Sequence, residues 1–162
     1  RFAADWDGVV PDLLCLGKAL GGGMPISACV GGDSSLGRWP VASGEALHTA
    51  TFLGHPVSCA AAIASLCELT ERDLAARADY LGMMATRRLR AAGLTVRGRG
   101  LMLGVVMPSG DEAWSVVERA LSAGVVLLSS GPGGEVLSLT PPLVIDEDQL
   151  IDALDTVIDC AC

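Results

Sequence analysis

A single lysine separates an apolar run from three consecutive glycines near the start of the chain, and this arrangement limits what the segment can form. The apolar run is 13–16, the lysine is Lys18 and the glycines are 21–23. A short apolar run bounded by turn residues predicts a buried strand. Glycine adopts backbone angles that other residues resist, so the chain can turn sharply after the lysine. A second apolar run at 27–30 predicts the next strand. We therefore expect Lys18 on a loop held between two strands.

A lysine at the end of a buried strand is expected to have little water around it. Restricted hydration disfavours the charged form of an amine. A neutral amine is a nucleophile that can form a Schiff base with a carbonyl compound. The pattern alone leaves the ordinary alternative open, in which Lys18 is a hydrated surface charge.

A second motif lies at 47–56 and reads Leu-His-Thr-Ala-Thr-Phe-Leu-Gly-His-Pro. Pro56 suits the first position of a helix. A hydroxyl and loop amides beside a helix start favour an anion, which makes Thr51 a candidate binding residue. The alternative for Thr51 alone is an ordinary loop or capping threonine. His48 and His55 have no aspartate or serine at an informative spacing, so we expect no chemical role for either.

The remaining segments alternate between helical and strand patterns. We expect an exposed loop with one helical turn at 33–47, a buried helix at 56–69 and an amphipathic helix at 74–92. Beyond it we expect two strand pieces at 95–107 and a helix that begins after Ser109 and turns Trp114, Val117 and Leu121 to one face. Strands at 125–128 and 136–143 follow, and then a last helix with a capping box of Asp146 and Gln149. This order fits a small α+β domain with helices on one face of a sheet.

Composition excludes several functional classes. The net charge is −8, which argues against non-specific binding to nucleic acid or to an anionic membrane. No apolar run approaches the roughly 20 residues of a membrane span. The six cysteines contain no Cys-x-x-Cys pair, and four lie in apolar runs. They are predicted to be small buried side chains of a cytoplasmic protein, with no disulfide and no metal site.

Three segments together resemble the class III aminotransferases, pyridoxal-phosphate (PLP) enzymes of the aspartate aminotransferase fold superfamily. Residues 16–26, Leu-Gly-Lys-Ala-Leu-Gly-Gly-Gly-Met-Pro-Ile, resemble the cofactor-lysine segment of this family. Thr51, followed by an aromatic residue and a Gly-x-Pro helix entry, matches its second signature. Residues 97–104, Arg-Gly-Arg-Gly-Leu-Met-Leu-Gly, resemble the opening of its small C-terminal domain.

The resemblance implies an α/β fold of the C-terminal part of such an enzyme. Residues 1–70 would be the C-terminal part of the large PLP-binding domain and residues 71–93 a connecting helix. Residues 94–162 would form the small α+β domain. In the family, the aspartate that holds the ring nitrogen, the stacking aromatic and most of the phosphate cup precede the segment matched by Arg1. We therefore expect a fragment with little or no activity by itself.

The resemblance also implies the chemistry. Lys18 would hold PLP as a Schiff base and then act as general base and acid. Thr51 would reach the cofactor phosphate of the neighbouring subunit in a homodimer. The reaction would transfer an amino group from an amine or amino acid to a keto acid or aldehyde. Three alternatives stay open: a PLP-dependent decarboxylase, an epimerase, or a non-catalytic dimerisation module.

One position departs from the family pattern. Relatives that act on amino acids often carry an arginine in a Val-Leu-Arg strand, where this chain has Ser138. Arginine binds a carboxylate through two parallel hydrogen bonds, and serine cannot replace its charge. An amine, a diamine or an ω-amino compound is therefore the expected donor, unless Arg97 or Arg99 supplies the charge.

Overall fold

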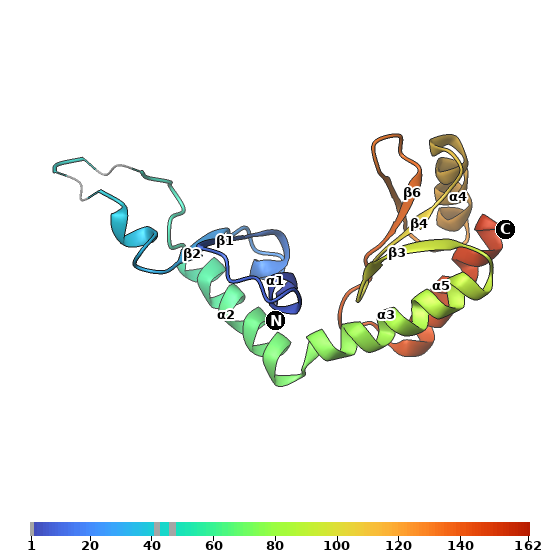
Figure 1. Ribbon diagram of the computed structural model, residues 1–162, viewed down its shortest axis with the longest axis horizontal. Coiled ribbons are helices and arrows are strands. Elements are labelled where there is room, and N and C mark those ends of the chain that lie inside the picture. The colour runs from blue at the N-terminus through green and yellow to red at the C-terminus, as the bar shows by residue number, and fades with distance from the viewer. Residues whose placement is uncertain (1, 41–42, 46–47) are drawn as a thin grey trace. The chain divides into compact units, whose positions relative to one another are not determined.

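The computed structural model describes residues 2–40, 43–45 and 48–162. The chain divides into two compact units, the first ending at Asp73 and the second running from Leu74 to Cys162. Both contain helices and antiparallel strands, so the chain is a mixed α/β protein (Figure 1). The second signature motif begins at Leu47, which lies outside the described residues, as do 41, 42 and 46 of the predicted loop.

The first unit holds a two-stranded antiparallel sheet and one long helix. Its elements are α1 (Ala3–Trp6), β1 (Leu13–Leu16), the 3₁₀ helix η1 (Lys18–Gly21), β2 (Ala28–Gly31), the 3₁₀ helix η2 (Leu36–Arg38) and α2 (Pro56–Glu71). The two predicted strands are present, and η1 forms the turn between them. The pairing sets Leu14 opposite Val30 and Cys15 opposite Cys29. η1 packs against α2.

Burial in this unit is less than the sequence predicts. Of the side chains of β1, Leu14 and Leu16 are half-buried, whereas Leu13 and Cys15 are exposed. The prediction of a buried helix at 56–69 is also wrong, since Ile63 is 63% exposed. α2 buries only Ser58 and Ala62. A helix that is apolar on every side is buried only when other elements cover every side. Here η1 covers one side of α2 and the other sides face solvent.

The cysteine prediction also needs correction. All six cysteines lie in the described part of the chain; Cys59 and Cys160 are half-buried and the other four are exposed. Apolar neighbours in the sequence do not predict burial of these cysteines, because the segments that carry them, in the first unit and at the chain end, are open to solvent.

The second unit closes around a four-stranded antiparallel sheet with the order β3-β4-β6-β5 (Figure 1). Its elements are α3 (Leu74–Ala91), β3 (Thr95–Arg99), β4 (Met102–Val106), α4 (Gly110–Ser122), β5 (Leu128–Ser130), β6 (Val136–Leu139) and α5 (Glu147–Ala161). Val96, Val105 and Leu137 face one another across three strands and are buried. α3 and α4 pack on the sheet and on α5, so the apolar core lies between the helices and the strands.

The helix patterns of this unit are confirmed in most respects. The predicted stripe of α3 is buried, and Leu81 and Leu89 are fully enclosed. Ser109 caps α4, with its Oγ accepting a hydrogen bond from the Glu112 amide. Asp146 caps α5 by accepting from the Asp148 amide at 3.0 Å, in place of the predicted box with Gln149.

Three predictions in this unit are wrong in detail. The strand predicted at 136–143 ends at Leu139, ahead of the two prolines. α4 buries Ala113, Val116, Val117 and Ala120, while Trp114 is 56% exposed. This stripe keeps the helical period but lies one residue before the predicted one at Trp114 and Leu121. The fifth strand begins at Leu128 and not at Val125, because the Val125 amide donates back to the carbonyl of Ala120 at the end of α4.

Candidate functional site

The turn that carries Lys18 is built from backbone hydrogen bonds. Gly17 continues β1 in an extended conformation, and η1 begins at Lys18. The Leu20 amide donates to the Gly17 carbonyl at 3.1 Å, and the Gly22 amide donates to the Ala19 carbonyl at 3.0 Å. Gly22 then leaves η1 at φ 56°, in the left-handed region that glycine tolerates. The triple glycine therefore lets the chain reverse within a few residues of the lysine.

Lys18 itself has a strained backbone. Its φ is 49°, and within the described residues only Asp73 shares a positive φ among residues other than glycine. A lysine in this region pays roughly 1–2 kcal/mol, because its Cβ approaches the following carbonyl oxygen. Such outliers gather at functional sites, where the surrounding structure holds them in place.

Packing fixes the turn against α2. Gly21 is buried, and a Cβ added there would come within 2.8 Å of the Ile26 side chain. A Cβ added at Gly22 would meet the Ser65 side chain of α2 at 3.9 Å. The turn that carries Lys18 is thus packed on Ile26 and on α2, and a substitution at Gly21 would require the Ile26 side chain to shift.

The side chain of Lys18 is exposed, which corrects the expectation of little water around it. The cause is the small size of this unit: a two-stranded sheet, one long helix and a few short helical turns leave the lysine without a covering layer. Among the described residues, no ion pair holds its ammonium group. Lys18 is also the single lysine of the chain, beside ten arginines. Any lysine-specific chemistry in these 162 residues therefore reports on this one position.

Thr51 lies in the turn that leads into α2, and its side chain is exposed. The Leu53 amide donates to the Ala50 carbonyl at 3.1 Å, and the His55 amide donates to the Phe52 carbonyl at 3.1 Å. Across the described part of the chain, no hydrogen bond joins Thr51 to Lys18. The two candidate residues are in one unit but are not brought together by a bond.

His55 has a structural part in this turn. It is the N-cap of α2, where its Nδ1 accepts from the Ser58 amide and lies 3.1 Å from Ser58 Oγ. The Phe52 ring stands edge-on to the imidazole, 5.7 Å between centroids. Pro56 occupies the first turn, as predicted. His48 is exposed.

The structure also shows two side-chain contacts that the sequence did not predict. Cys15 Sγ lies 4.0 Å from Cys29 Sγ across the β1–β2 ladder. In the second unit, Ser138 Oγ and Ser130 Oγ share a hydrogen bond at 2.8 Å. Both contacts depend on strand register, which residue spacing alone does not reveal.

In the described part of the chain, acidic, histidine and cysteine side chains nowhere cluster in a group able to hold a metal ion. No described helix is both long and apolar enough to cross a bilayer.

Comparison with known proteins identifies relatives over nearly the whole chain. Acetylornithine aminotransferase of Mycolicibacterium smegmatis is 39% identical, with 99% of this chain and 41% of the relative aligned. The leucine/methionine racemase of Thermococcus litoralis is 38% identical over 95% of this chain and 37% of its own length. This chain therefore spans about two fifths of the curated relatives that it matches.

Solved structures agree with the sequence relatives. The ornithine aminotransferase of Toxoplasma gondii superposes with a TM-score of 0.85 at 36% identity, covering 98% of this chain and 38% of that one. That structure was described with partial occupancy of PLP at its active site. The aminotransferase class-III family model matches residues 1–161. The chain therefore belongs to the class III aminotransferases, a PLP-dependent family.

Proposed function

We propose that this chain supplies the cofactor lysine of a PLP-dependent aminotransferase and that this lysine is Lys18. The observation that carries the proposal is the backbone of Lys18, which is held at φ 49° in the turn that follows β1. Strained backbone positions that the surrounding structure supports cluster at functional sites, and a residue that must meet a cofactor and a substrate carbon needs a fixed starting position. The single lysine in the family's motif adds weight to it.

The residues present fit PLP in two respects. An exposed amine can react with the cofactor aldehyde, and no described carboxylate competes for the Lys18 ammonium in an ion pair. Thr51 offers a hydroxyl next to the first turn of α2, where unpaired amides favour a phosphate. We propose that Thr51 donates to the phosphate bound by a second copy of the chain, so that the working enzyme is a homodimer.

The proposed roles divide between chain and cofactor. PLP, when bound, supplies an electron sink for charge that develops at the substrate carbon. Lys18 Nζ would take the proton from that carbon as general base and deliver it, as general acid, to the carbon that was the cofactor's aldehyde. The reaction is the transfer of an amino group from an amine or amino acid to a keto acid or aldehyde. We expect the remaining cofactor contacts to lie outside these 162 residues, which by themselves give little or no turnover.

The proposed donor is an amine, a diamine or an ω-amino compound. Ser138 stands where the family resemblance leads us to expect an arginine, and its hydroxyl shares a hydrogen bond with Ser130 Oγ at 2.8 Å. A neutral serine pair offers no charge to an α-carboxylate. In the longest natural form of the protein loaded with PLP, Ser138→Arg should lower the KM for α-amino acids and raise it for simple amines. Equal effects on both donor classes would contradict the assignment.

A second candidate is racemisation, which the leucine/methionine racemase among the relatives favours. Decarboxylation is the third. A donor labelled with nitrogen-15 separates them in the longest natural form of the protein loaded with PLP. Transamination moves the label to the acceptor. Racemisation inverts the donor and leaves its nitrogen in place, and decarboxylation releases carbon dioxide. Label that stays with the donor would overturn the proposed aminotransferase activity.

A further inference from the structure

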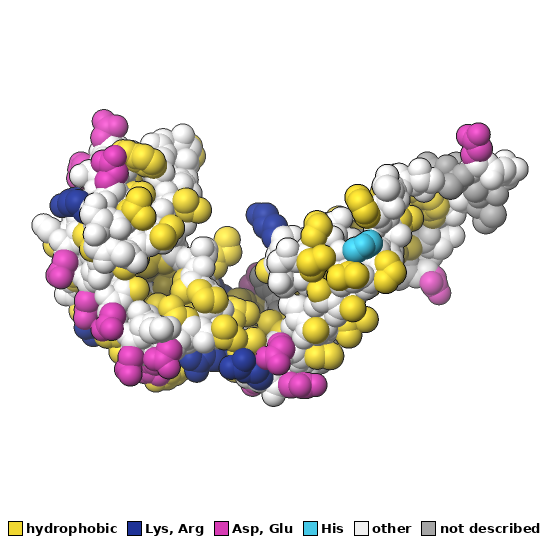
Figure 2. Space-filling model, turned by 180° about the vertical axis from the view of Figure 1, so that it is seen from behind, with side chains coloured by type: hydrophobic (Ala, Val, Ile, Leu, Met, Phe, Trp, Pro, Cys, Tyr) yellow, Lys and Arg dark blue, Asp and Glu magenta, His cyan; other side chains and the backbone are white. Residues whose placement is uncertain are grey.

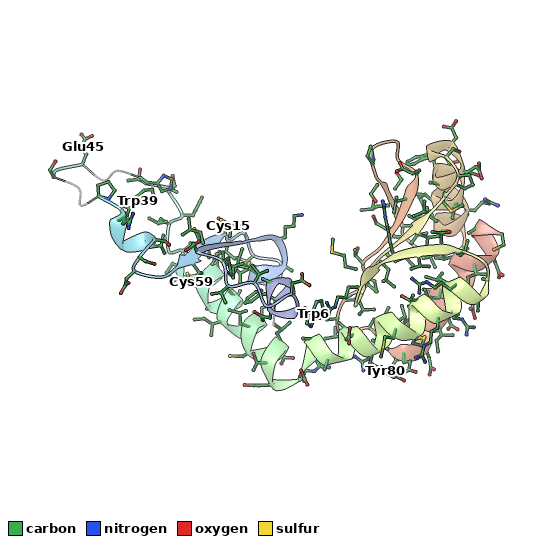
Figure 3. All side chains as sticks on the ribbon, in the orientation of Figure 1. Trp6, Cys15, Trp39, Glu45, Cys59 and Tyr80 are labelled. Carbon is green, nitrogen blue, oxygen red and sulfur yellow. The ribbon has the colours of Figure 1, made fainter. Side chains whose placement is uncertain are left out.

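Two cysteines face each other at the base of the Lys18 turn. Cys15 is in β1 and Cys29 in β2, directly opposite in the antiparallel register. Their sulfur atoms are 4.0 Å apart, and both side chains are exposed. Figure 3 labels Cys15 at this ladder. The two positions are 14 residues apart in sequence, so only the strand pairing brings them together.

The geometry of this pair suits a covalent bond. Residues directly opposite in an antiparallel ladder have Cα atoms about 4.5–5.5 Å apart. A disulfide accepts Cα separations of about 4.4–6.8 Å and needs an S–S length of about 2.05 Å. The sulfur atoms can close the remaining gap by side-chain rotation, with the strands staying paired.

The chemistry of the pair agrees with this geometry. The hydrogen bond between the two thiols raises the pKa of Cys29, and partial desolvation adds to the effect. The raised pKa keeps Cys29 a neutral thiol to a higher pH than an ordinary cysteine, so two adjacent thiolates are avoided. In the described part of the chain no second pair of cysteine sulfurs is in contact.

We propose that Cys15 and Cys29 form a reversible disulfide that closes residues 16–28, including Lys18, into a loop. The oxidant is a small disulfide of the glutathione class. One cysteine thiolate attacks a glutathione sulfur, forms a mixed disulfide and releases one glutathione. The other cysteine attacks that mixed disulfide, completes the Cys15–Cys29 bond and releases the second glutathione. Two protein thiols are oxidised, and one glutathione disulfide is reduced to two thiols that carry the two protons. This proposal does not depend on the proposed enzyme activity.

Trypsin makes the test direct, because it cuts after Lys18 and after Arg38. Cys15 then falls in the peptide that ends at Lys18, and Cys29 in peptide 19–38, each without another cysteine. The natural protein in its longest form, free of PLP so that Lys18 remains cleavable, is equilibrated with oxidised and reduced glutathione. Free thiols are then blocked with N-ethylmaleimide, and the unreduced digest is analysed by mass.

We expect these two peptides to appear as one cross-linked species, which dithiothreitol separates. Cys15→Ala and Cys29→Ala should each lose it. Cys67→Ser, at an exposed cysteine of α2, should retain it and serves as the matched control. Three results would overturn the proposal: blocked thiols at both positions under oxidising conditions, glutathione carried separately by each cysteine, or either cysteine joined to a different one. The wild-type digest decides this even if a variant fails to fold.

Discussion

The two units of this protein differ in how far their apolar side chains are buried. The second unit encloses Leu81, Leu89 and Leu137 completely between three helices and a four-stranded sheet. The first unit leaves Val57 57% exposed and Ile63 63% exposed on α2, and hydrophobic side chains are visible on its surface (Figure 2). The candidate functional residues, Lys18 and Thr51, belong to the unit with the open surface. The closed apolar core and the residues proposed for function therefore lie in different units.

The contrast has a physical consequence for folding. Buried apolar area supplies most of the favourable free energy of a fold, at about 25 cal/mol per Å². The second unit has a closed core of this kind, and the first has a two-stranded sheet, which is marginal in water without further layers. We expect the second unit to hold most of the stability of the 162-residue chain.

Matched truncations on two helices test this contrast most strongly. Leu89→Ala in α3 removes a fully buried side chain and should lower the free energy of unfolding by about 2–5 kcal/mol. Ile63→Ala in α2 removes an exposed one and should change it by about 0.5 kcal/mol or less. Urea denaturation of the 162-residue chain measures both. Similar losses would mean that α2 is covered in solution.

A close contact between α3 and the residue that follows β3 gives a second test of packing in the second unit. A Cβ at Gly82 in α3 would lie 2.1 Å from the Gly100 carbonyl oxygen. Gly82→Ala should therefore destabilise by roughly 1–3 kcal/mol, although alanine is the better helix former. Gly44→Ala meets nothing within 4 Å and is the control, expected to be near neutral. Thermal unfolding compares the two, and a stabilised Gly82→Ala would refute the contact.

The strain at Lys18 can be measured in the same way. Lys18→Gly relieves a positive φ and should stabilise the chain by up to about 1 kcal/mol. Asp73→Gly relieves a similar φ but should gain less, because aspartate tolerates this region better than lysine does. Urea midpoints of the two variants give the comparison. A loss of stability in Lys18→Gly would show that the side chain, and not the backbone angle, dominates at this site.

The smallest effect is expected at the ion pair between α3 and α5. Arg88 donates to both carboxylate oxygens of Asp155 and lowers its pKa. A carboxyl with a lowered folded pKa adds stability above its unfolded pKa, and that stability is lost as pH falls through the folded value. Melting temperatures from pH 7 to about pH 2 should fall less steeply in Asp155→Asn. The difference should be small, because both side chains are more than 40% exposed. Identical slopes would mean that the pair contributes nothing.

The sequence predicted best where local periodicity decides the outcome. The stripe of α3, the caps at Ser109 and Asp146, and the strand–turn–strand around Lys18 all follow from residue spacing. Prediction from the sequence failed where the outcome depends on which other element packs against a helix. Whether α2 is covered is one such case, and which face of α4 meets the sheet is another.

The candidate site shows the same division. Its motif residues could be named from the sequence, and the structure places them on turns as expected. The positive φ of Lys18 could not be foreseen, because lysine seldom adopts it. The Cys15–Cys29 contact and the Ser130–Ser138 contact follow from register, which a single sequence does not specify. The roles of Lys18 and Thr51 remain predictions.

Borohydride trapping tests the central claim most directly. The longest natural form of the protein is mixed with PLP, reduced, digested and mapped by mass. The account predicts a pyridoxyl group on Lys18, and its complete loss in Lys18→Ala. Lys18→Arg, which keeps the positive charge but cannot be trapped, should lose it equally. A protein that carries no adduct at Lys18, or that is trapped equally well in the Lys18→Ala variant, would contradict the account.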